Sequence, residues 1–158
     1  MHPINIFSNI ILPCKVQIQK GVFSAMGYAL SWSSPFSFSF TALCPLLDGL
    51  SFERQLPSEV SHLAITSSIL YVGLSCEIKR FCLSGVELPS IRIPYEVVSM
   101  ASYEDTLAVA VNQGVGYLGY RQMHVQFFGE QTKEIPCALD QYRQLKWMGF
   151  SEEGMLII

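Results

Sequence analysis

Leu56-Pro57-Ser58-Glu59-Val60 returns 37 positions later, in matching residue types, as Ile93-Pro94-Tyr95-Glu96-Val97. In both copies an apolar pair, a short polar turn and a second apolar segment follow, in residues 63–72 and 100–111. A third copy begins near Leu145, where residues 148–158 match residues 100–110 at a spacing of 48. Self-similarity at a period of about 20–50 residues is typical of repeat architectures. The sequence therefore predicts a fold built from repeated units.

Each of the first two units divides into four short segments rich in Val, Ile, Leu, Tyr and Phe, which favour β-strands. Turn-forming residues such as Ser84-Gly85 and Glu104-Asp105 separate them. The predicted strands are residues 60–65, 69–74, 77–83 and 86–93, then 97–102, 106–112, 122–129 and 134–139. Four antiparallel strands about every 40 residues are the pattern of a propeller blade. A β-sandwich also has short, evenly spaced strands and stays as the alternative, but the matching of whole units favours the propeller.

We therefore predict an all-β chain, a partial β-propeller of four-stranded antiparallel blades. Residues 51–158 are predicted to form about two and a half blades of it. A ring needs about four to eight blades, so we expect a piece of a longer polypeptide or a truncated gene model. Residues 1–50 are poorly defined, and two explanations stay open: divergent blade sequence or an artefact of the gene model. Within them, the alternation of Phe36, Phe38 and Phe40 with serine predicts a strand with one apolar face.

Composition narrows the function classes. The 158 residues are 50% hydrophobic, 15% charged and carry a net charge of −3. No basic patch is present, so we predict no direct nucleic-acid binding by this segment. No apolar run approaches the roughly 20 residues of a spanning helix, and the N-terminus is a poor secretory signal, so we expect a soluble, intracellular chain without membrane contact. The five cysteines include no C-x-x-C pair, which favours reduced, mostly buried thiols.

One string resembles a nucleotide-binding motif. Gly114-Val115-Gly116-Tyr117-Leu118-Gly119 spells G-x-G-x-x-G, which in a dinucleotide-binding fold opens a helix that meets the pyrophosphate. Here a predicted strand follows it, so a hairpin loop is the better interpretation. Enzymatic function stays as a competing hypothesis, and this loop is the single sequence feature that supports it.

The sequence predicts structural roles for the histidines and for the acidic residues in the turns. His2, His62 and His124 are isolated, and none lies at metal-ligand spacing from another histidine or a cysteine. The carboxylates in predicted turns are interpreted as solvated; they are Glu104, Asp105, Glu152 and Glu153. We therefore predict no catalytic residue, no cofactor, no metal site and no enzymatic activity.

The most distinctive segment is Leu145-Lys146-Trp147-Met148-Gly149-Phe150. Its aromatic residues at a spacing of three can form an exposed recognition surface. The alternative is the innermost strand of a blade, where Gly149 permits close packing near the central channel. The fit of the segment to the repeat favours the inner strand.

Residues from about 60 to 158 resemble the SepB-type propeller of the WD-repeat and HMG-box DNA-binding protein family. The similarity rests on residues 78–86 and 103–109, and above all on residues 145–154, Leu-Lys-Trp-Met-Gly-Phe-Ser-Glu-Glu-Gly. The resemblance implies a non-enzymatic replisome adaptor in the nucleus. Such adaptors form homotrimers through this propeller, link the replicative helicase to DNA polymerase α, and act in sister-chromatid cohesion.

Three domains that occur in members of that family are absent from these 158 residues: the N-terminal WD40 propeller, the C-terminal helical bundle and the HMG box of animal members. No binding residue of the family maps onto this chain, so the protein-interface residues are unknown from the sequence. A generic WD40-like propeller scaffold in another protein complex stays as the alternative function.

Overall fold

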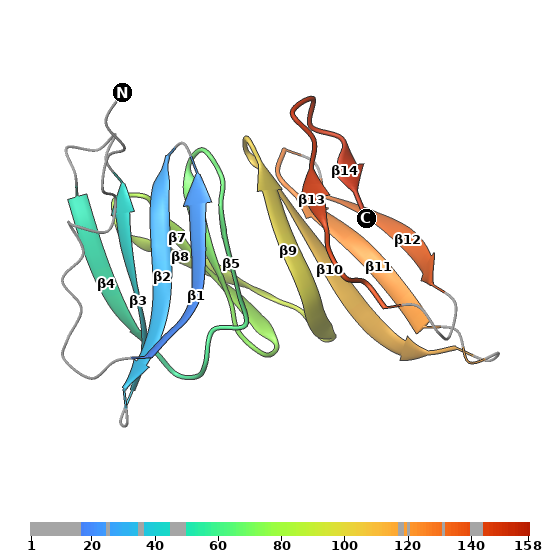
Figure 1. Ribbon diagram of the computed structural model, residues 1–158, viewed down its shortest axis with the longest axis horizontal. Coiled ribbons are helices and arrows are strands. Elements are labelled where there is room, and N and C mark those ends of the chain that lie inside the picture. The colour runs from blue at the N-terminus through green and yellow to red at the C-terminus, as the bar shows by residue number, and fades with distance from the viewer. Residues whose placement is uncertain are drawn as a thin grey trace.

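The computed structural model describes residues 17–24, 26–34, 37–44, 50–116, 119, 121–130, 132–139 and 144–158 (Figure 1). Within these ranges the chain forms three four-stranded sheets and one two-stranded sheet, and in each sheet consecutive strands pair antiparallel. The same ranges contain no helix that is long and apolar enough to cross a membrane. The predicted all-β class is confirmed.

The first sheet lies in the part of the chain where the sequence was least informative. Its strands are β1 (Gln17–Ser24), β2 (Gly27–Ser34), β3 (Ser37–Cys44) and β4 (Leu50–Leu56). Phe38 and Phe40 pack into one apolar cluster, as their period of two predicted; Phe36 lies outside the described residues. On the other side of the sheet, Trp32 Nε1 donates a buried hydrogen bond of 3.0 Å to Thr41 Oγ1.

The second and third sheets follow the two predicted repeat units. The second contains β5 (His62–Ile65), β6 (Ile69–Gly73), β7 (Glu77–Cys82) and β8 (Glu87–Arg92). The third contains β9 (Glu96–Tyr103), β10 (Thr106–Val115), β11 (Arg121–Phe128) and β12 (Lys133–Leu139). All eight strands lie where the sequence placed them, apart from a few residues at their ends.

The last sheet pairs β13 (Gly149–Phe150) with β14 (Leu156–Ile157). The turn between β13 and β14 is one residue longer than the turn between β9 and β10. Three residues separate Ser151 from Met155, and the Ser151 N–H donates a hydrogen bond of 2.9 Å to the Met155 carbonyl oxygen. Only two residues separate the corresponding partners Tyr103 and Thr106 in the third sheet. The spacing of 48 therefore holds for the first strand, but Leu156 rather than Met155 takes the place of Leu107.

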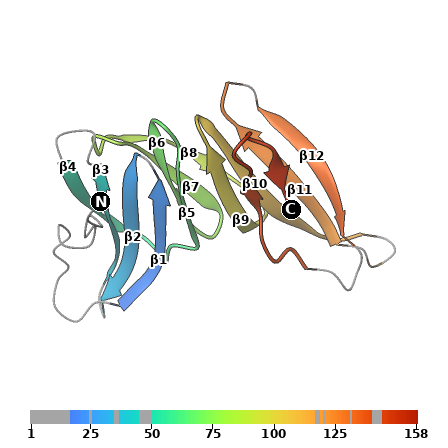
Figure 2. The same ribbon diagram turned by 45° about the horizontal axis from the view of Figure 1, so that its top comes forward.

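The four sheets stack in chain order. The first strands of successive sheets are neighbours: β1 lies beside β5, β5 beside β9, and β9 beside β13 (Figures 1 and 2). One apolar cluster fills each gap between neighbouring sheets. The clusters are centred on Phe40 and Phe81 between the first two sheets, on Ile78 and Val109 between the next two, and on Ala108 and Met148 between the last two. Sheets of four strands that stack around their first strands define a partial β-propeller, as predicted.

The thiols depart from the expected burial. Cys76 is exposed, Cys82 and Cys137 are half-buried, and all three are free. The prediction of mostly buried thiols is wrong for these residues, because they lie on a turn, at a strand end and on the outer strand β12.

Candidate interaction surface

His62 joins two sheets. It begins β5, and its Nε2 lies 3.0 Å from the Val98 carbonyl oxygen on β9, while its Nδ1 lies 3.1 Å from Ser61 Oγ. Burial lowers the pKa of His62 most strongly; the Val98 carbonyl opposes this effect, and the charge of Lys20 adds to it. The neutral imidazole, with its proton on Nε2, is therefore the form that fits this position. The structural role predicted for His62 agrees with this arrangement.

The acidic turn residues also connect sheets. In the turn between β5 and β6, the Ser67 N–H donates to the Glu104 carbonyl oxygen at 2.8 Å, and the Ser67 hydroxyl donates to Asp105 Oδ1. Tyr103 extends the connection, because its hydroxyl donates to the Glu152 carbonyl oxygen at 3.0 Å. All four predicted turn carboxylates are exposed; they are Glu104, Asp105, Glu152 and Glu153. Asp105 is thus more than a solvated turn residue, since it accepts a hydrogen bond from the preceding repeat.

The glycine-rich string connects β10 to β11, and these two strands pair antiparallel on either side of it. Gly114 lies near the end of β10, where the pairing with β11 shifts register, and Gly119 lies between the two strands; their φ angles of +105° and +77° are ones that other residues rarely adopt. Residues 117, 118 and 120 lie outside the described ranges. The prediction of a hairpin loop in place of a helix N-terminus is confirmed.

His124 lies on the outer half of the third sheet. Its Nδ1 is 2.7 Å from Glu134 Oε1 on the neighbouring strand, but the two groups do not align as a hydrogen bond. His2 lies outside the described residues. Within the described part of the chain, no group of three or more His, Cys, Asp or Glu side chains can hold a metal ion.

The segment around Trp147 has an exposed aromatic ring and leads into an inner strand. Gly149 begins the inner strand β13, and the Trp147 ring lies so close to it that an added Cβ would be 2.6 Å from Cη2 of that ring. Met148 is buried against the third sheet, whereas Trp147 is 60% exposed. The close packing predicted at Gly149 therefore exists, but its partner is the neighbouring tryptophan.

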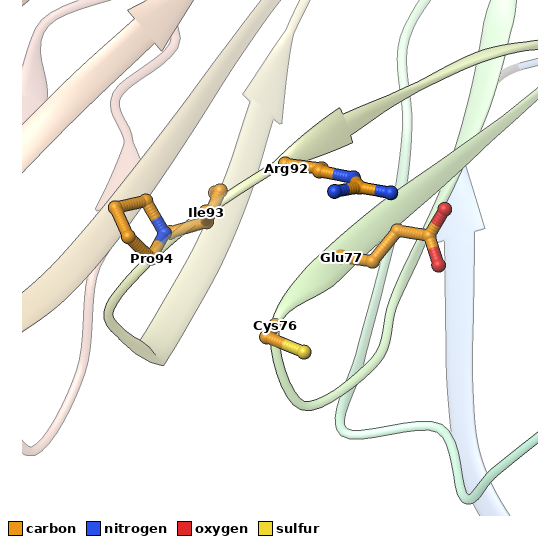
Figure 3. Close-up of a pocket in the computed structure, with 5 residues that line it drawn as sticks. All are labelled: Cys76, Glu77, Arg92, Ile93 and Pro94. Atoms are coloured by element: carbon orange, nitrogen blue, oxygen red, sulfur yellow. The ribbon is translucent and has the colours of Figure 1, made fainter.

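In the part of the chain that the structure describes, pockets open at the connections between sheets. One, of about 380 Å³, is lined by Cys76 and Glu77 at the start of β7, by Arg92 at the end of β8, and by Ile93 and Pro94 after it (Figure 3). The other, of about 460 Å³, is lined by Lys20, residues 58–62 and Ser75. Each of the two repeated segments contributes to one pocket: Ile93 and Pro94 line the first, and Ser58, Glu59 and Val60 line the second. The sequence did not predict either pocket, since their residues come from separate repeats.

Four-stranded antiparallel sheets that stack around their first strands are the blades of a β-propeller, and this fold is the class of protein that the structure defines. The sequence matches the family described as "Minichromosome loss protein, Mcl1, middle region" over residues 6–158. That match covers nearly the whole chain, so the chain belongs to this family.

Curated relatives agree with this family. WD repeat and HMG-box DNA-binding protein 1 of Homo sapiens is 31% identical over 97 residues, which are 58% of this chain and 8% of the relative. The Xenopus laevis protein is 32% identical, and the Mus musculus protein 30%, each over 83 residues, which are 49% of this chain and 7% of the relative. These relatives are named for WD repeats, an HMG box and DNA binding rather than for a reaction. The chain spans less than a tenth of their length.

Solved structures support the fold alone. A crystal structure of BBS1N in complex with ARL6DN, soaked with mercury, has a TM-score of 0.51 at 15% identity and covers 91% of this chain and 45% of that chain. The same complex soaked with lead has a TM-score of 0.51 at 14% identity and covers 88% of this chain and 41% of that chain.

Proposed function

We propose that this chain is a non-enzymatic scaffold segment of a nuclear, replication-associated WD-repeat protein. In this role it helps to link the replicative helicase to DNA polymerase α during DNA replication and sister-chromatid cohesion. The observation that carries the proposal is the match to the Mcl1 middle region over residues 6–158. The propeller fold is compatible with it, since propellers present turns and connections as protein-binding surfaces.

We further propose that residues 17–56 are a divergent blade of the same propeller, so that the fold begins before residue 51. Three features support this view. The first sheet has the same strand order as the next two, β1 lies beside β5, and Phe40 and Phe81 meet at 4.9 Å between ring centroids.

The experiment is co-elution of the purified chain, alone and within its complete polypeptide, with purified helicase and DNA polymerase α subunits. The proposal expects complexes with both partners for the complete polypeptide, together with its self-association into trimers. The control is Val86→Ala, a substitution at a side chain that is 60% exposed, which is expected to bind both partners as the wild type does. Failure of the folded, complete polypeptide to bind either partner would contradict the adaptor role and favour a generic propeller scaffold in another complex.

A further inference from the structure

The first sheet has two apolar faces. Ala29 on β2 and Phe40 on β3 point toward the second sheet and belong to the cluster that fills the gap between the two sheets. Successive side chains of a strand point to opposite faces, so Tyr28, Leu30 and Trp32 of β2 lie on the other face. We call this second face the outer face, because the first sheet stands at one end of the stack of described sheets (Figure 1).

The side chains of the outer face are buried. Tyr28 is 2% exposed, Leu30 5% and Trp32 4%, and the polar residues Ser39 and Thr41 beside them on β3 are 3% and 7% exposed. The second sheet lies on the opposite face, and none of the other described sheets lies on this one. The cover of the outer face must therefore come from residues of this chain outside the described ranges.

The length of the outer face limits which segment can cover it. From Tyr28 to Trp32 it runs for about 13 Å, at roughly 3.3 Å per residue. Residues 1–16 are long enough, because sixteen extended residues span up to about 50 Å. Residue 25 and the pair 35–36 are too short. The segments that adjoin the first sheet and lie outside the described ranges are residues 1–16, 25, 35–36 and 45–49.

Residues 45–49 cannot reach the whole outer face. They join Cys44 to Leu50, and these two residues pair directly at one end of the sheet. Since both ends of a five-residue connection are held there, it extends at most about 10 Å from them. Trp32 pairs with Ser39, which lies five residues from Cys44 along β3, or about 17 Å away. The burial of Trp32 therefore points to the N-terminal segment.

The composition of the N-terminal segment fits this position. Residues 3–13, Pro-Ile-Asn-Ile-Phe-Ser-Asn-Ile-Ile-Leu-Pro, contain six large apolar side chains and no charged one. Removing such side chains from water is favourable, and the outer face offers them aromatic and aliphatic partners. The match to the Mcl1 middle region begins at residue 6, eleven residues before β1, so the family's domain includes most of this run.

We propose that residues 4–12 pack across the outer face of the first sheet, with their apolar side chains against Tyr28, Leu30 and Trp32. In a closed propeller a neighbouring blade packs on such a face, so the segment takes the position of a blade. The occupant is thus a segment of this chain and not a partner protein. The inference goes beyond the scaffold role and does not depend on the partners proposed for it.

The direct test is nuclear Overhauser spectroscopy on the 158-residue chain with labelled isoleucine and leucine methyl groups. We expect contacts between the ring protons of Tyr28 and Trp32 and methyl groups of residues 4–12, which single isoleucine-to-valine substitutions assign. Absence of contacts to residues 4–12 would overturn the proposal. So would contacts of the Trp32 ring to Leu46 or Leu47, because they would assign the cover to residues 45–49.

A pair of variants tests the same cover by fluorescence. Trp32 and Trp147 are the two tryptophans of the chain, so a Trp147→Phe background leaves Trp32 as the reporter. Ile10→Asp combined with Ile11→Asp places two charges in the apolar run. We expect this change to raise the acrylamide quenching of Trp32 from that of a buried indole toward that of the 60% exposed Trp147.

The matched control is Leu46→Asp combined with Leu47→Asp, which makes the same charge change in residues 45–49. It should leave the quenching of Trp32 as in the parent chain, and unchanged hydrogen exchange in β10 identifies the variants that remain folded. Quenching that rises equally in both variants, or in the control alone, contradicts the proposal. If the variant of residues 10 and 11 does not fold, the Overhauser contacts of the unaltered chain decide.

Discussion

At the scale of single residues, the turn between β7 and β8 depends on Gly85. Its φ is +93°, and a Cβ added there would lie 3.0 Å from Cγ of Phe52 on β4. The Gly85 carbonyl oxygen also accepts a hydrogen bond of 2.6 Å from Arg54 Nη2. We expect Gly85→Ala to lower the free energy of unfolding by more than the roughly 1–2 kcal/mol that left-handed backbone strain alone costs. Gly114→Ala is the matched control, because Gly114 has a φ of +105° and nothing within 4 Å. Equal losses in urea denaturation would contradict the role of the Phe52 contact.

His62 makes folding depend on pH. Its pKa in the folded chain lies below the ordinary value of 6.5, so the folded state binds fewer protons than the unfolded state between these two values. Stability is therefore full above pH 6.5 and falls as the pH drops from 6.5 toward the folded pKa, where the loss levels off. His62→Gln removes this contribution. The difference between wild type and variant, measured by urea denaturation from pH 7.5 to 5, should isolate this contribution of His62. A difference that is independent of pH would show that His62 does not titrate differently on folding.

At the scale of elements, Phe81 connects the first two sheets. It is 1% exposed, and its ring centroid lies 4.9 Å from that of Phe40 and 6.4 Å from that of Phe52. Phe81→Ala removes this contact and leaves a cavity, which costs about 3–5 kcal/mol for buried aromatic residues. We expect hydrogen exchange to accelerate in both β3 and β7, whereas Val86→Ala, at a 60% exposed site, should change little. Acceleration confined to β7 would show that the first sheet is a separate unit.

The strands differ in how far the sequence could predict them. Strands β5 to β12 were predictable because turn residues separate them and each repeat supports the other. β2 was not, since Tyr28, Ala29 and Leu30 are all buried and a strand covered on both faces shows no alternation. The pocket beside His62 was equally invisible. Lys20, Ser58 and Ser75 are far apart in sequence and meet only because the first strands of the sheets are neighbours.

At the scale of the whole molecule, stacked sheets that contact only their neighbours should open from the end with the fewest contacts. Residues 107–111 of β10 are 0% exposed and lie between two apolar clusters. Among the described strands, β14 pairs with β13 alone, and Ile157 is 47% exposed. We therefore expect native-state hydrogen exchange to give the β13 and β14 amides an opening free energy lower than that of β10 by about 2 kcal/mol or more.

A variant decides whether this difference reflects local opening. Gly154 has a φ of +77°, and an added Cβ would lie 2.6 Å from Cε1 of Tyr103. Gly154→Ala should therefore disrupt the turn that holds β13 against β14 and speed exchange in these two strands, while the exchange of β10 stays unchanged. If hydrogen exchange in β10 accelerates by the same factor, the four sheets unfold as one cooperative unit, and a change in the last turn lowers the stability of all four.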